Sequence, residues 1–364
     1  MKRKTLIASL ITSIVIIGGI VVGSILIPKS KEAQINLYVV ETNTNPGTNG
    51  GQAVLVKGKK ANVLIDTGST YYSESLTLNK VYNTFNNEID TLVLTSLADE
   101  YNGGLIKFFT SERYSIPHVK NLYYPGYKVD NDTSKYLEET LIPQLKQSGT
   151  NVCTASDVIN GVTTCKGLID ISENYEVQIL NTGYYTTEEI TSEDINLHNM
   201  VVSVNGKSNN FHFIFDGGLT DVSLKSFNTY YPGLVNNVDA WLLSNQKIEP
   251  YMNCEYYLGF KPKTTVFTAS SYGQTRPSIY NRLTSEQFKT LLNISGKNIY
   301  STLTMGTINI GVTKNGKMSF KGSEVTMYKA LNNTENERFI YSDLVRNNQN
   351  FANIVKEVLG IDVS

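Results

Sequence analysis

The chain has 364 residues, which exceeds the usual length of one domain, although a single β-rich domain can be this long. Hydrophobic residues make up 40% and charged residues 18% of the sequence, a composition that excludes disordered and fibrous proteins. The net charge of −1 is unevenly distributed, because the first 31 residues hold five Lys or Arg and no acid, which leaves 27 basic and 33 acidic residues after them. An acidic body argues against binding of nucleic acid, whose phosphate backbone requires clustered Lys and Arg.

The N-terminal segment predicts a membrane anchor. Thr5–Ile27 contains no charged residue and is long enough for a helix that crosses the hydrocarbon core of a bilayer. It follows Lys2-Arg3-Lys4, which favours a cytoplasmic N-terminus and an exported body. A cleaved signal peptide is the alternative, but its apolar core would be shorter and followed by an Ala-x-Ala site. We therefore expect a single-pass protein of the cell membrane, with residues 1–30 as the anchor and its cytoplasmic tip, and with an extracytoplasmic C-terminal domain.

In chain order, the body alternates strands with helices. Apolar runs and period-two alternation predict strands at Ile35–Glu41, Gln52–Lys57, Ala61–Asp66, Ile89–Thr95, Val119–Tyr124, Asn151–Ser156, Gly167–Ile171, Tyr175–Leu180, Met200–Val204, Phe211–Phe215, Val238–Leu243, Thr264–Thr268, Asn298–Tyr300, Thr307–Thr313 and Met318–Lys321. Helical spacing predicts helices at Ser75–Phe85, Gly103–Thr110, Ser134–Ser148, Ser278–Leu292 and Glu335–Leu359. The third of these helices contains Pro143, which predicts a kink or a split. A hairpin is expected about Asn205-Gly206. Hairpins mixed with β-α steps predict a layered α/β body.

The chain contains three cysteines. If the body is exported, Cys153 and Cys165 are candidates for a disulfide, because oxidising compartments allow such bonds. The alternative is two unpaired thiols. Cys254 is then left over and is interpreted as a small buried apolar residue. No CxxC or His/Cys spacing of a zinc site is present.

Short motifs along the body occur in a recognisable order. They are Gly51-Gln52-Ala53-Val54-Leu55-Val56, Val63-Leu64-Ile65-Asp66-Thr67-Gly68, Ile89-Asp90-Thr91-Leu92-Val93-Leu94-Thr95, Asn102-Gly103-Gly104-Leu105, Asn121-Leu122-Tyr123-Tyr124-Pro125-Gly126, Asn199-Met200-Val201-Val202-Ser203-Val204, Phe213-Ile214-Phe215-Asp216-Gly217-Gly218, Val238-Asp239-Ala240 and Lys261-Pro262-Lys263-Thr264-Thr265-Val266. In this order they resemble the metallo-β-lactamase fold, and specifically the C-terminal domain of the competence-type DNA-uptake channel family. The resemblance implies a four-layer αββα sandwich over residues 31–325, followed by a helical tail over residues 326–364.

The departures from that family concern its metal ligands. The family carries a His-x-x-x-Asp-His core whose ligands hold metal ions that activate water. By this resemblance the two first ligand positions fall on Ser96 and Ala98, the Asp on Glu100 and the closing His on Tyr101. The remaining positions fall on Gly218 for the bridging Asp, on Asn245-Gln246-Lys247-Ile248 for a His-His-Gly-Ser segment and on Arg276 for the final His. Asp66 is retained, although it is not one of the ligand histidines.

The histidine content leads to the same conclusion. A dinuclear hydrolase site of this kind uses about four or five imidazoles. The chain contains only His118, His198 and His212, none of which lies close to another in the sequence. We therefore expect a degenerate cleft without metal or other cofactor, in which Arg276 lies near Asp99 or Glu100 and can pair with a carboxylate.

Two hydrolytic alternatives remain open. Asp99 and Glu100, with Asp66 and Asp216, could form a rebuilt Mg²⁺ or Ca²⁺ site of a phosphodiesterase or nuclease, because hard cations prefer carboxylate oxygens. The stretch from Val63 to Ser69 also resembles the Asp-Thr-Gly-Ser motif of aspartic proteases, which use two carboxyl groups sharing a proton. No Gly-x-Ser-x-Gly elbow and no phosphate-binding Gly-rich loop is present.

The sequence favours a membrane-anchored pseudoenzyme of the metallo-hydrolase fold over an enzyme, without deciding between them. Such a protein would bind or scaffold an unidentified protein or ligand of the cell envelope. The bilayer is its other expected partner, through Thr5–Ile27, and nucleic acid is disfavoured by the acidic body.

Overall fold

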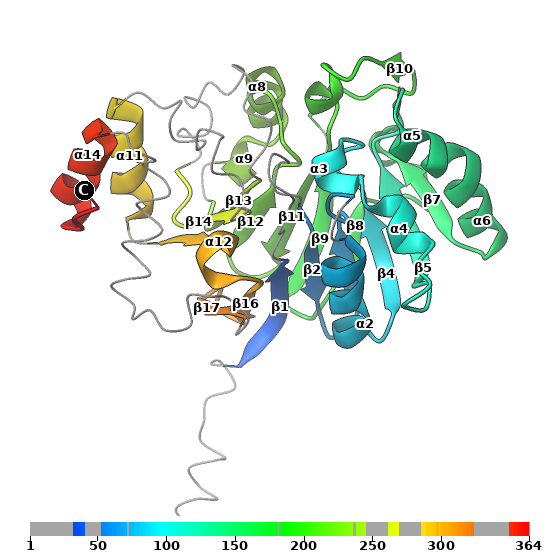
Figure 1. Ribbon diagram of the computed structural model, residues 1–364, viewed down its shortest axis with the longest axis horizontal. Coiled ribbons are helices and arrows are strands. Elements are labelled where there is room, and N and C mark those ends of the chain that lie inside the picture. The colour runs from blue at the N-terminus through cyan, green and yellow to red at the C-terminus, as the bar shows by residue number, and fades with distance from the viewer. Residues whose placement is uncertain are drawn as a thin grey trace, which may run out of the picture.

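The computed structural model describes residues 32–40, 52–70, 73–180, 182–235, 238–244, 261–268, 285–296, 298–323 and 349–363. Two mixed β-sheets form the centre of the described part (Figure 1). Each sheet is antiparallel in one half and parallel in the other. The alternation of hairpins with β-α steps in the sequence has this physical origin, because parallel neighbours need crossover connections whereas antiparallel neighbours do not.

The first sheet has eight strands. In spatial order they are β17 (Met318–Gly322), β16 (Ile308–Thr313), β1 (Ala33–Val39), β2 (Val54–Lys57), β3 (Asn62–Ile65), β4 (Glu88–Val93), β5 (His118–Tyr124) and β7 (Asn151–Thr154). The strands from β17 to β3 pair antiparallel, and those from β3 to β7 pair parallel. The carboxyl ends of β3, β4, β5 and β7 therefore open at one end of the sheet.

The second sheet has seven strands. In spatial order they are β15 (Ile299–Ser301), β14 (Thr265–Thr268), β13 (Ala240–Ser244), β12 (His212–Phe215), β11 (Val201–Gly206), β9 (Tyr175–Leu180) and β8 (Leu168–Asp170). Strands β8, β9, β11 and β12 pair antiparallel, and β12 to β15 pair parallel. A separate short parallel pair joins β6 (Lys128–Val129) to β10 (Glu189–Ile190).

Helices cover the outer faces of both sheets (Figure 1). The helical segments that connect or follow strands β3 to β7 of the first sheet are the π-helical turn η2 (Ser73–Leu78), α2 (Asn79–Phe85), α3 (Asp99–Asn102), α4 (Leu105–Phe109), α5 (Asp132–Tyr136), the π-helical turn η3 (Leu137–Leu141), α6 (Ile142–Gln147) and α7 (Ala155–Ile159). The second half of the chain contributes the 3₁₀ turn η4 (Ile195–Leu197), α8 (Asp221–Tyr230), α9 (Pro232–Val235), α11 (Ser285–Ser295), α12 (Thr302–Met305) and α14 (Gln349–Leu359).

Three hydrophobic clusters define the layers. Between the sheets, side chains such as Ile35, Val63 and Ile65 of the first sheet pack against Val177 and Phe213 of the second. Outside the first sheet, Leu64 and Leu92 meet the helical residues Val81, Phe85 and Phe108. Outside the second sheet, Ile214 and Trp241 meet Leu224, Phe227 and Val355. Alternate residues of a strand point to opposite faces, so a strand covered on both sides is apolar throughout. This is the four-layer αββα sandwich that the sequence predicts.

Most predicted elements lie within a few residues of the observed ones, and three local differences have clear causes. Strand β7 ends at Thr154 and not at Ser156, because Thr154 and Asp157 form a capping box. This capping box starts helix α7, which the sequence analysis does not predict. Strand β11 continues through Gly206, so the hairpin turn lies after Gly206 rather than about Asn205-Gly206. The helix predicted over Ser134–Ser148 is split as expected, with Pro143 in the first turn of α6.

The predicted disulfide is present. Cys153 and Cys165 are bonded, with their Cα atoms 5.6 Å apart. Cys153 belongs to β7, the edge strand of the first sheet, and Cys165 precedes β8, the edge strand of the second sheet. The bond therefore ties the same edge of the two sheets together, around the short helix α7.

Several sequence predictions lie outside the described residues. They include the anchor Thr5–Ile27, the segment Asn245–Ile248, Cys254 and Arg276. Within the described ranges, no helix combines the length and the apolarity needed to span a bilayer.

Candidate functional site

The loops at the carboxyl ends of β3, β4 and β12 come together at one end of the sandwich. The N–H of Met200 donates to the carbonyl of Thr95 at 2.9 Å, which joins the second sheet to the loop after β4. Gly217 has a positive φ of 57°. A Cβ at this position would lie 2.4 Å from the carbonyl oxygen of Met200 and 3.0 Å from the Cβ of Thr95. Only glycine fits such a position without strain or collision.

Asp66 is the centre of this region. It directly follows β3, has a φ of 59° and is fully buried. Its Oδ1 accepts hydrogen bonds from the Thr95 N–H and the Asn102 side-chain amide, both at 2.7 Å. Its Oδ2 accepts from the Thr95 hydroxyl at 2.6 Å and from the Gln52 amide at 3.0 Å. Four donor groups from three residues thus converge on one carboxylate.

The same donors organise the following loop. Asn102 also donates to the Ser96 carbonyl at 2.7 Å, and its Oδ1 accepts from the Thr67 N–H at 3.0 Å. The carbonyl of Tyr101 accepts from the N–H of Gly68 at 2.8 Å. These bonds fold residues 94–102 back onto the turn after β3, so Asp66 holds that turn.

A second chain of hydrogen bonds spans the two sheets. The Tyr127 hydroxyl accepts from the Leu97 N–H at 2.9 Å and donates to Asn199 Oδ1 at 3.1 Å. The Asn199 amide then donates to the Gly217 carbonyl at 2.6 Å. Burial raises the pKa of Tyr127 above its usual range, so the phenol stays neutral and serves as a structural bridge.

Burial dominates the electrostatics of both retained carboxyl groups. It raises the pKa of Asp66 to about 7, against the lowering effect of the hydrogen bonds from Thr95, Asn102 and Gln52. It raises the pKa of Asp216 to about 6, against hydrogen bonds from the Gly218 N–H at 3.0 Å and the Trp241 indole N–H at 2.9 Å. Each carboxylate has its own donors, an arrangement unlike the proton-sharing pair of an aspartic protease.

The other residues proposed for the degenerate cleft occupy different environments. Ser96 and Tyr101 are buried at 0% and 1% exposure, and Gly218 is also buried. Ala98 precedes α3 and is half-buried. Asp99 and Glu100 lie in the first turn of α3, where negative charge is favourable, and the Thr70 hydroxyl donates to Asp99. Asn245 and Arg276 lie outside the described residues, so the expected contact of Arg276 with Asp99 or Glu100 stays a prediction.

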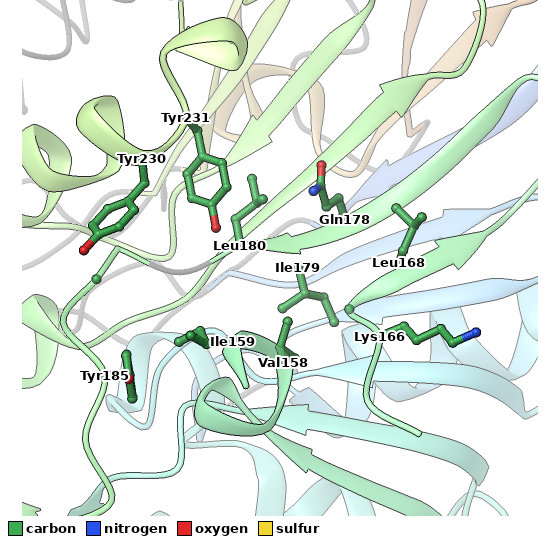
Figure 2. A pocket seen from close by; sticks show the side chains of 12 residues that line it. Val158, Ile159, Lys166, Leu168, Gln178, Ile179, Leu180, Tyr185, Tyr230 and Tyr231 are labelled. Carbon is green, nitrogen blue, oxygen red and sulfur yellow. The ribbon is translucent and has the colours of Figure 1, made fainter. Parts of the chain in front are cut away.

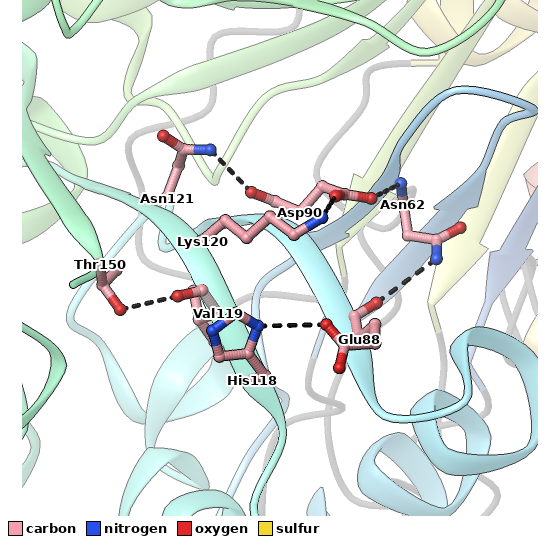
Figure 3. Close-up of polar contacts among 8 residues, drawn as sticks. All are labelled: Asn62, Glu88, Asp90, His118, Val119, Lys120, Asn121 and Thr150. Atoms are coloured by element: carbon pink, nitrogen blue, oxygen red, sulfur yellow. Dashed lines mark hydrogen bonds and ion pairs between the residues drawn. The ribbon is translucent and has the colours of Figure 1, made fainter. Parts of the chain in front are cut away.

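Two of the three histidines lie at the opposite ends of their strands from this region. His118 begins β5 and its Nδ1 lies 3.1 Å from Glu88, beside the ion pair of Lys120 with Asp90 at 2.6 Å (Figure 3). His212 begins β12 and its Nδ1 lies 2.9 Å from Asn205 Oδ1. His198 alone lies beside the loops, with its ring 6.2 Å from that of Tyr127.

The described residues at this end of the sandwich do not fit a dinuclear metal centre. Ala98 and Gly218 have no ligating side chain, while the oxygens of Asp66 and Asp216 already accept hydrogen bonds from protein donors. Within the part of the chain that the structure describes, no three His, Cys, Asp or Glu side chains are grouped so that they could hold a metal ion. The hydrogen bonds to these two carboxyl groups instead hold the loops to one another.

Comparison with known proteins identifies similar folds. No protein-family model and no curated protein matches the sequence. The metallo-beta-lactamase fold protein YhfI from Bacillus subtilis is similar with a TM-score of 0.43 and 10% identity, over 76% of this chain and 98% of that one. A diphosphatase from the PhnP family (TM-score 0.39, 12% identity, 79% and 99% covered) and unliganded yeast PDE1 (0.40, 8%, 74% and 98%) are also similar.

Similarity at these TM-scores supports no residue role in this chain. The fold description rests on the chain's own two mixed sheets and their outer helices, which form a metallo-β-lactamase-like α/β sandwich.

Sequence reasoning did not identify most of the residues that hold this region together. Gln52, Thr95 and Asn102 stood within recognised motifs without an assigned role, and Tyr127 and Asn199 were not singled out for the site. No local pattern distinguished them; Asn102, for example, follows the polar residues Asp99 and Glu100 and precedes Gly103-Gly104, as in an ordinary surface loop.

Proposed function

We propose that this chain is a membrane-anchored, extracytoplasmic protein of the metallo-β-lactamase fold that binds a ligand or partner and does not hydrolyse it. The proposal rests on two points. The fold is associated with metal-dependent hydrolysis, but the side chains of its loops around Asp66 form hydrogen bonds with one another. A place beside a DNA-uptake channel stays a prediction from the sequence resemblance alone.

One observation carries the non-catalytic part. Asp66, the acidic residue retained beside the altered ligand positions, accepts four hydrogen bonds and has no exposed surface. A carboxylate in that state cannot approach a metal ion or a substrate without losing several buried hydrogen bonds, each of which is costly to leave unmade. Ser96, Tyr101 and Asn102 of the following loop are therefore buried as part of the core.

The disulfide supports the extracytoplasmic part. Cys153 and Cys165 are both at most 3% exposed and lie within the core between the sheets. A disulfide of this kind is rare in reducing compartments and common in exported proteins. The positively charged residues before Thr5–Ile27 are consistent with the same orientation.

The metal content of the purified full-length chain tests the proposal. The protein would be prepared in detergent without chelator, incubated with Zn²⁺ or Mn²⁺, passed through a desalting column and analysed by mass spectrometry of the elements. We expect less than about 0.1 ion per chain. One or two tightly bound ions per chain would contradict a non-catalytic role and would favour the hydrolase alternative.

A cleavage assay provides the second arm. Single-stranded and double-stranded DNA and bis(p-nitrophenyl) phosphate would be incubated with the same preparations. We expect no turnover above that of an Asp66→Asn variant prepared in parallel. Metal-dependent cleavage by the parent chain would contradict the non-catalytic role.

A further inference from the structure

Exposed apolar side chains gather at one edge of the sandwich. Among the described residues, nine large apolar side chains are exposed. Six of the nine lie at or beside the edge formed by α7, β8 and the end of α8, namely Ile159, Val162, Leu168, Tyr184, Tyr185 and Tyr230. Single exposed apolar residues need no explanation, whereas a concentrated group marks an interaction site.

A cavity of about 560 Å³ lies within this group of side chains (Figure 2). It lies beside the end of α8 at Tyr230, along the last two strands of the second sheet, β9 and β8. Leu168 of β8 pairs directly with Gln178 of β9, so both side chains project from the same face of the sheet. The volume falls in the range of sites for small organic ligands.

The aromatic side of the cavity is shaped by backbone geometry. Gly183 has a φ of 81°, and a Cβ there would lie 2.4 Å from the Tyr230 ring. The ring therefore rests against the Gly183 backbone, which limits its freedom. The rings of Tyr230 and Tyr231 lie 6.5 Å apart, and Tyr185 lies on the same side of the cavity (Figure 2).

The opposite side is aliphatic and polar. Figure 2 shows Gln178, Leu168 and Lys166 across the cavity from the tyrosines. A second cavity of about 430 Å³ shares Lys166 and Leu168 with the first, so the hollow continues along the sheet edge. None of the described residues that line the first cavity is acidic.

This chemistry restricts the ligand. A groove for nucleic acid would need more than one cation, and a metal ion would need carboxylate or imidazole ligands. An added β-strand would have only the three residues of β8 to pair with, and short edge strands disfavour such pairing. Tyrosine combines a flat apolar face with a hydroxyl that can donate and accept hydrogen bonds, which suits a ring that is apolar on its faces and polar at its edges.

We propose that this groove binds a linear glycan, whose sugar rings pack on Tyr185, Tyr230 and Tyr231 and whose hydroxyl groups accept hydrogen bonds from Gln178 and Lys166. The inference deepens the proposed binding role, on which it rests, and gives it a ligand class. An extracytoplasmic domain held near the membrane by its anchor would meet such chains in the cell envelope.

Isothermal titration calorimetry of the full-length chain in detergent tests the proposal. The probes are chitotetraose, cellotetraose and tetragalacturonate, with an acidic octapeptide for comparison. We expect at least one glycan to bind with 1:1 stoichiometry. The Tyr230→Ala variant should weaken that binding at least tenfold, because Tyr230 is 63% exposed and its loss leaves the fold intact.

The Tyr82→Ala variant is the matched control, since Tyr82 is also exposed, at 48%, but lies outside the groove, and its affinity should stay within twofold of the parent. Absence of saturable binding of all three glycans at 10 mM (about the weakest range that the method resolves) would overturn the proposal. Equal weakening by both variants, or peptide binding that depends on Tyr230, would overturn it as well. Metal content, which reports on the loops around Asp66, does not depend on these tyrosines, so the two proposals can fail separately.

Discussion

Replacement of Asp66 by Asn tests whether the buried carboxylate organises the loops at the end of the sandwich. The amide keeps one oxygen, which can accept two of the four hydrogen bonds, and turns its own N–H groups toward the remaining donors. Each buried donor left without an acceptor costs about 1–3 kcal/mol. Two such donors predict a loss of about 2–6 kcal/mol in the free energy of unfolding.

The pH dependence of this loss gives the sharper test. Because burial raises the pKa of Asp66 to about 7 in the folded chain, above the value of 3.8 for an unburied group, the folded state binds the proton more tightly. The stabilisation from this proton is complete below about pH 4 and is lost as the pH rises through 7. The Asn variant has no such group, so the difference between parent and variant should be larger at pH 5 than at pH 8.

Urea unfolding followed by circular dichroism at pH 5 and pH 8 measures both effects. Asp170→Asn is the matched control, because Asp170 is half-exposed and forms surface ion pairs with Lys60 and Lys207, which contribute about 0–1 kcal/mol. A loss below about 1 kcal/mol for Asp66→Asn at pH 5 would refute the network as a stabilising unit. A larger loss at pH 8 than at pH 5 would refute the role of burial in setting the pKa.

Three further predictions address other parts of the molecule. Gly217→Ala should lower the free energy of unfolding by about 2 kcal/mol, because its Cβ would collide with the Met200 carbonyl, whereas Gly233→Ala, with open space around it, should cost nothing measurable in the same urea experiment. Replacing both Cys153 and Cys165 by Ser should cost about 3 kcal/mol, and a parent protein equally stable with and without reductant would contradict this. Protease added to intact protoplasts should digest the body of the anchored chain, and a protected body would place it in the cytoplasm.

Local patterns in the sequence determined much of the fold. Alternation of apolar and polar residues predicted β9 at its observed bounds, Tyr175–Leu180, because side chains in a strand point alternately to its two faces. Pro143 marked the split before α6, since proline lacks the N–H that continues a helix. Thr154 and Asp157 have the spacing of a capping box, which is a local sequence signal for the start of α7.

Tertiary structure alone decided the chemistry of the site. Whether Asp66 meets a metal, a substrate or protein donors depends on Gln52, Thr95 and Asn102, which are between 14 and 36 positions away from it in the sequence. The groove beside Tyr230 likewise exists only where the end of α8 lies beside β9 and β8. The periodicity of apolar residues in the sequence shows which face of a helix or strand is apolar. The burial and the hydrogen-bond partners of a side chain arise only when distant segments pack together, because the desolvation of a group depends on all the atoms around it.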